Sequence, residues 1–168
     1  AEDLSDYPDV LLEDNEFEGY MIVGETADTT EVIAAIEIAS SLNSLQCDID
    51  NIESVNNCGT GILKLDTELD NYYEKNIIAV GTPCSNEVVD HFADYPEDCS
   101  NGLDYNKAKI KLNNINGKYQ LIVTGYSTSD LKKASEVLKN YKKYDLVGNK
   151  ICIEGSETNP ELKVCEYN

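Results

Sequence analysis

The sequence of 168 residues contains no arginine and no tryptophan, and only one histidine and one methionine. Without arginine, the chain lacks the side chain that binds phosphates and carboxylates through paired hydrogen bonds. Without tryptophan, it lacks a common stacking platform for sugars. Long apolar runs are also missing, since none approaches the roughly 20 residues that cross a bilayer. We therefore predict no membrane-spanning helix and no strong anion or sugar site.

Acidic side chains are in large excess. There are 32 Asp and Glu against 13 cations, all of them lysine, for a net charge of -19. Residues 1–60 hold 15 acids and no lysine, a charge of -15, and residues 61–168 hold 17 acids and 13 lysines, a charge of -4. Such a field repels nucleic-acid phosphates and anionic lipids, so neither is an expected partner. It does favour bound cations.

The six cysteines predict disulfides. No two of them form a C-x-x-C pair, which disfavours zinc ribbons and thioredoxin-like sites. Pairing neighbours in sequence closes loops of about 12 to 16 residues, each worth about 3 kcal/mol in the chain-entropy model. Other pairings and six reduced thiols remain as alternatives. Disulfides imply an oxidising, extracellular compartment. The pairs we expect are Cys47–Cys58, Cys84–Cys99 and Cys152–Cys165.

Three segments repeat one pattern, in which an apolar run ends in glycine and is followed by a helical pattern. The runs lie at 20–24, 77–81 and 121–125. Runs that are apolar throughout predict strands buried on both faces. The predicted fold class is therefore α/β, a helix-flanked and mainly parallel sheet built from three strand-Gly-helix units. Hairpin strands are added at 107–112, with a turn at 113–117, and at 150–154 with 162–166.

Each predicted helix has a start signal. Asp28 with Glu31 and Ser127 with Asp130 form capping pairs, and Thr82 precedes a proline at the first helical position. The 3.6-residue period predicts one buried face on each of the two longer helices. On the first helix that face comprises Val32, Ile36, Ala39 and Leu42. On the last helix it comprises Leu131, Ala134, Leu138 and Tyr141.

The domain organisation is predicted as an acidic N-terminal arm, residues 1–18, followed by a single disulfide-bonded domain, residues 19–168. The arm contains an apolar run, Val10, Leu11 and Leu12, that could form one strand. We expect this run to add to a sheet edge of a neighbouring subunit and so to form a homo-oligomer. The alternative is that the segment packs on its own domain.

Candidate chemistry is sparse. Asp48, Asp50 and Glu53 lie in the loop that Cys47 and Cys58 would close, and they are candidate calcium ligands, although the EF-hand pattern is absent. Single glycines after the strands do not match a phosphate-binding motif. The sequence has no G-x-S-x-G motif, so the only histidine, His91, lacks the serine nucleophile that such a motif would supply. We predict no catalytic residue, no cofactor other than calcium, and no enzymatic activity.

Several segments resemble the S-layer proteins of methanogenic and Thermococcus-like archaea. The likeness includes residues 3–8 (DLSDYP), the strand and helix at 20–42, residues 76–84 (NIIAVGTPC) and residues 121–138. It covers about residues 20–145 and the acidic start. The resemblance implies a secreted, self-associating surface protein. Because S-layer subunits are usually longer, the chain is either one domain of such a subunit or a small subunit that polymerises in its own way.

The predicted function is therefore structural. We expect a subunit of an extracellular archaeal surface assembly, either an S-layer-like lattice or a filament. The alternative is a surface-displayed adhesin or ligand-binding module.

The disulfide pattern gives a first prediction. Peptide mapping without reduction should recover Cys47 with Cys58, Cys84 with Cys99, and Cys152 with Cys165, because these pairs close the shortest loops. The same digest after reduction is the control. Free thiols throughout would contradict both the pairing and the extracellular compartment.

Overall fold

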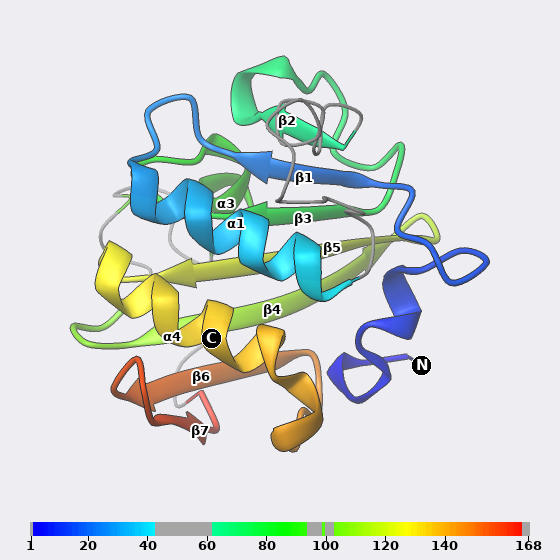
Figure 1. The fold of residues 1–168 in the computed structure, drawn as a ribbon. Coiled ribbons are helices and arrows are strands. Elements are labelled where there is room, and N and C mark those ends of the chain that lie inside the picture. Colours follow the sequence, from blue (N-terminus) through cyan, green and yellow to red (C-terminus); the bar gives the residue numbers. More distant parts are fainter. Residues whose placement is uncertain (1, 43–61, 94–98, 100–102, 166–168) are drawn as a thin grey trace, which may run out of the picture.

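The computed structural model describes residues 2–42, 62–93, 99 and 103–165. These residues form a seven-stranded mixed sheet in the order β2-β1-β3-β5-β4-β6-β7, with α1 and α4 on one face and α3 on the other (Figure 1). No helix in these ranges is long and apolar enough to cross a membrane. In chain order the elements are η1 (Leu4–Asp6), η2 (Asp9–Leu11), β1 (Tyr20–Val23), α1 (Thr29–Ser41), β2 (Leu63–Leu65), η3 (Asp66–Glu68), β3 (Ile77–Val80), α3 (Glu87–His91), β4 (Ala108–Ile115), β5 (Lys118–Gly125), α4 (Thr128–Lys139), η4 (Tyr141–Lys143), β6 (Lys150–Gly155) and β7 (Pro160–Lys163).

The sheet is mixed rather than mainly parallel. β1 runs parallel to β2 and β3, and β3 runs parallel to β5. β4 is antiparallel to both β5 and β6, and β6 is antiparallel to β7. The α/β class is confirmed, but the added hairpins supply as many antiparallel pairings as there are parallel ones. Two of these antiparallel pairs, β4–β5 and β6–β7, are hairpins, because a short turn can join only antiparallel neighbours, whereas a parallel pair needs a long crossover. The third, β4–β6, joins the two hairpins across a longer connection through α4.

The central strands are buried on both faces. In β1, Met21 and Val23 face the layer under α1 and α4, while Ile22 faces the layer under α3. The same alternation continues in β3 and β5, whose aliphatic side chains are at most 3% exposed. Continuous apolar runs were therefore a reliable signal for these strands, because two helical layers leave neither face to water.

The β4–β5 hairpin is tighter than the sequence analysis expected. β4 continues to Ile115, which pairs with Lys118, so that the turn is only two residues long. Both turn residues have positive φ, 56° for Asn116 and 79° for Gly117. Asn-Gly favours this twisted two-residue turn, and its twist matches that of the strands. The predicted turn at 113–117 was too long for this reason.

Two of the three helix starts are as predicted. Asp28 caps α1 and Ser127 caps α4, each accepting a hydrogen bond from the backbone three residues on. The start of α3 was predicted wrongly, at Thr82. Residues 82–86 form a turn instead, and Asn86 caps the helix by accepting from the backbone N–H groups of the second and third residues after it.

The buried face of α1 differs from the predicted one. Ile36 was expected in the core but is 46% exposed. Alanines dominate the buried face, and they allow α1 to lie close to the sheet and to α4. Because α1 is apolar on nearly every side, periodicity alone did not select the face correctly. The fully buried residues of α1 are Glu31, Ala34, Ala35, Ile38 and Ala39. On α4 the predicted Leu131, Ala134 and Leu138 are buried.

The N-terminal segment packs into its own domain. Leu4, Tyr7, Leu11 and Phe17 are at most 5% exposed and belong to the core under α1 and α4. Residues 9–11 form the short helix η2 instead of the expected strand, with Val10 and Leu12 partly buried against the core. This is the alternative that the sequence left open. Leu11 is therefore not available to a neighbouring sheet in this structure.

Two of the expected disulfides are present. Cys84–Cys99 and Cys152–Cys165 have Cα–Cα distances of 4.9 and 5.1 Å, within the usual range. The second bond joins Cys152 in β6 to Cys165, two residues after β7, and so links the two strands of the hairpin. The third pair, Cys47 and Cys58, lies outside the described residues, as do the candidate calcium ligands Asp48, Asp50 and Glu53.

Packing of the N-terminal segment gives a second prediction. Leu11→Ala should lower the free energy of unfolding by about 2 to 5 kcal/mol, because a fully buried leucine leaves a cavity when truncated. Urea titration followed by circular dichroism measures this. Val164→Ala, at a residue 89% exposed, is the control and should change little. Equal stability of the two variants would mean that the segment is a detached arm.

Candidate functional site

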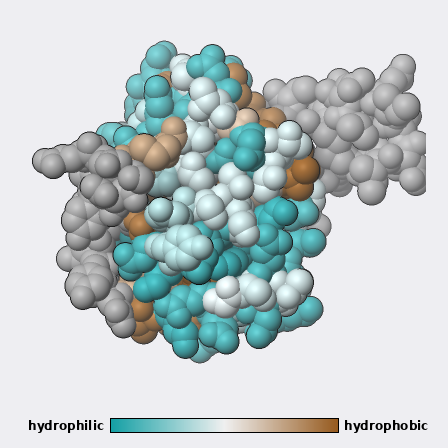
Figure 2. All heavy atoms as spheres, turned by 90° about the vertical axis from the view of Figure 1, so that its left-hand side faces the viewer, coloured by the Kyte–Doolittle hydropathy of each residue, from teal (hydrophilic) through white to brown (hydrophobic). Residues whose placement is uncertain are grey.

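The carboxyl edge of the parallel strands is the first place to look for a site. Open α/β sheets bind ligands outside this edge, where the strand order reverses. Here the order reverses between β1 and β3, because β2 continues from β1 on one side and β3 continues on the other. Figure 2 looks onto this edge, and its described surface is mainly hydrophilic.

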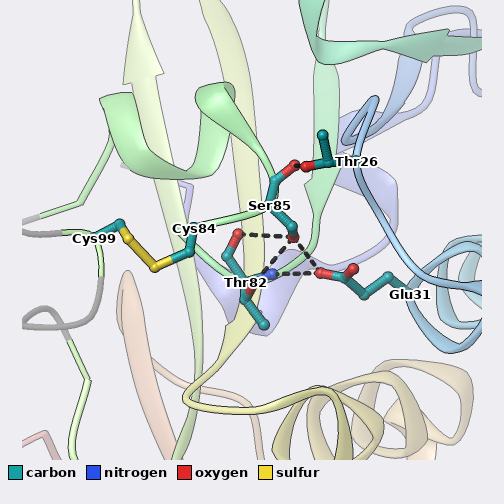
Figure 3. Close-up of a disulfide and its surroundings, with 6 residues drawn as sticks. All are labelled: Thr26, Glu31, Thr82, Cys84, Ser85 and Cys99. Carbon is teal, nitrogen blue, oxygen red and sulfur yellow. Dashed lines mark hydrogen bonds between the residues drawn. A yellow bond between two sulfur atoms is a disulfide. The ribbon is translucent and has the colours of Figure 1, made fainter.

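Glu31 joins the loops that follow β1 and β3 (Figure 3). Its side chain lies in the first turn of α1 and is 2% exposed. Oε1 accepts hydrogen bonds from the Thr82 backbone N–H at 2.9 Å and from the Ser85 hydroxyl. Oε2 accepts from the Asp28 backbone N–H at 2.8 Å. Three donors therefore satisfy this buried carboxylate.

The contact between the two loops depends on a glycine. A Cβ atom on Gly24 would lie 1.8 Å from the Ser85 carbonyl oxygen, which is backbone and cannot move aside. Thr26 reaches the same carbonyl oxygen, to which its hydroxyl donates at 3.4 Å. Glycine after β1 thus permits a close approach of two backbones.

Asp66 forms a second bridge at the same edge. It follows β2 directly and is 4% exposed. Its Oδ1 accepts from the Glu25 backbone N–H and its Oδ2 from the Glu87 backbone N–H, both at 2.8 Å. Asn86, 1% exposed, adds a third link because its amide donates to the carbonyl oxygens of Ile22 and Val80. The ends of β1, β2 and β3 and the start of α3 are joined by these three side chains.

A pocket of about 270 Å³ lies beside these bridges, next to the Cys84–Cys99 disulfide. Carboxylates of Glu25, Asp66, Glu87 and Asp90 line it. They make the pocket unfavourable for a phosphate, and the N-terminus of α1 already carries Asp28 and Glu31. Among the residues that the structure describes, no three His, Cys, Asp or Glu side chains group as metal ligands.

His91 belongs to an aromatic cluster and not to these bridges. Its Nε2 lies 3.0 Å from the Tyr73 hydroxyl, and its ring lies 5.0 Å from the ring of Tyr72. Phe92 completes the cluster. Burial, followed by the charge of Glu87, raises the pKa of Tyr72. The histidine thus packs as an exposed aromatic side chain at the end of α3.

The residues singled out from sequence are not brought together at this edge. Leu11 and its neighbours lie at the opposite, amino edge, where the Asn76 amide donates to the Leu11 carbonyl oxygen at 3.4 Å. Sequence reasoning identified Glu31 only as a helix cap, and it missed Asp66 and Asn86 altogether. The sequence signals that could have identified them are their positions: Asp66 directly follows a strand, and Asn86 directly precedes a helix.

Comparisons with known proteins do not add a family. No protein-family model matches the chain, and no curated protein is significantly similar to it in sequence. The resemblance to archaeal S-layer proteins therefore stays a prediction.

The geometry of Glu31 gives a third prediction. Glu31→Gln should lower the free energy of unfolding by about 1 to 3 kcal/mol, because the new amide NH₂ would face one of the buried N–H donors. Thermal or urea unfolding measures the change. Glu25→Gln is the matched control, since that side chain is exposed at the same edge. If both variants unfold alike, Glu31 does not hold the loops together.

Proposed function

We propose that the chain is a structural subunit of an extracellular surface assembly, an S-layer-like lattice or a filament, and that it has no catalytic role. The observation that supports this most is the use of carboxylates at the carboxyl edge. Glu31 and Asp66 accept hydrogen bonds from the chain's own backbone, where ligand-binding α/β proteins leave donors open. The edge is therefore built to join loops.

The disulfides support an extracellular location for this subunit. Disulfides persist in oxidising compartments and are rare in the reducing cytosol. Cys152–Cys165 holds the hairpin at one edge of the sheet, and Cys84–Cys99 holds the loop after β3. Such covalent links stabilise the folded state of a protein in an oxidising, extracellular environment.

Cations are proposed partners of the assembly. A subunit of charge -19 repels its copies unless counterions screen or bridge them. Calcium prefers carboxylate oxygens, and Asp48, Asp50 and Glu53 remain the proposed ligands. The proposal for these three residues rests on sequence alone.

One observation favours the second candidate, a surface-displayed ligand-binding module. Tyr105 is 73% and Tyr126 45% exposed, and their rings meet edge to face with centroids 5.6 Å apart. The Tyr126 backbone N–H also donates to the Lys107 carbonyl oxygen, which fixes this corner. Exposed tyrosines held in place offer contact area at a low cost in entropy.

Assembly of the purified protein tests the proposal and is the fourth prediction. Electron microscopy and sedimentation, with and without calcium, should show concentration-dependent association into regular arrays. Calcium should promote it by bridging carboxylates, and chelator should reverse that effect. Sodium chloride of equal ionic strength controls for screening. A protein that stays monomeric at every concentration in both salts contradicts the structural role and favours the binding module.

A further inference from the structure

The outer face of α1 is apolar although it is exposed. Ile33 is 48% and Ile36 46% exposed, one turn apart on the side of the helix away from the sheet. The two charged residues of α1 are Glu31, which is buried, and Glu37. Helices that are apolar on all sides are generally covered on all sides. In a chain with 32 acidic residues, two exposed isoleucines one turn apart on a helix are unusual.

A groove runs between this face and α4. The two helices lie side by side on the same face of the sheet and run in the same direction (Figure 1). The groove has a volume of about 500 Å³, and Ile33 forms part of its wall. Its charged lining has both signs, with Glu37 from α1, Lys132, Glu136 and Lys139 from α4, and Glu157 from the loop between β6 and β7. The Lys132 ammonium lies 3.9 Å from the Glu157 carboxylate, which leaves Lys139 as the groove lysine without an ion pair among the residues that the structure describes.

The charges of the groove indicate which molecule fits it. A second copy of this chain also carries -19, so most of its surface repels the acidic parts of the first copy. The described stretch 2–42, for example, has no lysine. Around the groove, however, two lysines, Lys132 and Lys139, line the same hollow as the carboxylates Glu37, Glu136 and Glu157. A surface with both signs side by side can meet its own copy with opposite charges facing each other.

We propose that this groove is the contact between two copies of the chain, related by a twofold axis. α1 of each copy lies over the groove of the other, which buries Ile33 and Ile36. Glu37 of each copy then faces Lys139 of the other, and the pairing occurs twice because the contact is isologous. The inference rests on the proposed self-association and names its surface. It yields a dimeric building block, which extends into an array through a second contact.

A double substitution on the outer face of α1 tests the apolar part of the contact and is the fifth prediction. Ile33→Glu/Ile36→Glu should raise the dimer dissociation constant at least about tenfold in sedimentation equilibrium. The melting temperature of the monomer should stay near that of the wild type, because both sites are exposed and glutamate favours helix. Val147→Glu/Val164→Glu is the matched control, with the same charge change at exposed valines outside the groove.

A charge exchange tests the pairing. Glu37→Lys and Lys139→Glu should each weaken the homodimer, because like charges then face each other twice. An equimolar mixture of the two variants should restore dimers, because both pairs again have opposite charges. Restoration only in the mixture supports the twofold contact, and no restoration overturns it.

The outcomes separate this inference from the proposed function. If the wild type forms arrays and Ile33→Glu/Ile36→Glu does so with unchanged affinity, the groove is not the contact, while the structural role stands. If the wild-type protein is monomeric in sedimentation but forms arrays under the microscope, the twofold dimer is again excluded. If it forms neither dimers nor arrays, both the contact and the structural role are excluded.

Discussion

The carboxylate of Glu31 is the interaction on which the centre of this fold depends. Its buried side chain links the N-terminus of α1 to the loop after β3, because it accepts hydrogen bonds from groups in both. A buried charge is stable only when hydrogen bonds compensate for the lost water, and here three donors do so. Asp66 repeats the arrangement for the neighbouring loops. Without these acceptors, several backbone N–H groups at this edge would be left unpaired.

This use of carboxylates changes what the edge can do. In α/β proteins that bind anions, the N–H groups at a helix start remain open to a ligand and the helix dipole attracts it. In this chain the carboxylates of Asp28 and Glu31 accept hydrogen bonds from backbone N–H groups at the start of α1, where an anion would otherwise bind. At the amino edge, Leu4, Tyr7 and Leu11 of the N-terminal segment bury their side chains in the core under α1 and α4. Among the residues that the structure describes, the outer face of α1 and the corner formed by Tyr105 and Tyr126 stay exposed.

Charge decides which of these surfaces suits another copy. The acidic residues are spread over most of the chain, whereas the lysines begin only at residue 64. α4 brings two of them, Lys132 and Lys139, into the groove that Ile33 of α1 also lines. A protein with this distribution stays dispersed through repulsion over most of its surface and can associate where lysine and apolar side chains meet. This charge distribution is the physical basis of the proposed contact between two copies of the chain.

The sequence by itself determined the local features. Apolar runs predicted β1, β3 and β5, capping pairs three residues apart predicted the starts of α1 and α4, and short spacing predicted Cys84–Cys99 and Cys152–Cys165. Each of these depends on residues close together in the chain. Only the tertiary structure decided the rest. The partners of Glu31 lie 51 and 54 residues away, and Asp66 bonds to a residue 41 positions before it. The buried face of α1, the mixed strand directions and the place of the N-terminal segment likewise depend on which distant surfaces meet, and no local pattern encodes that.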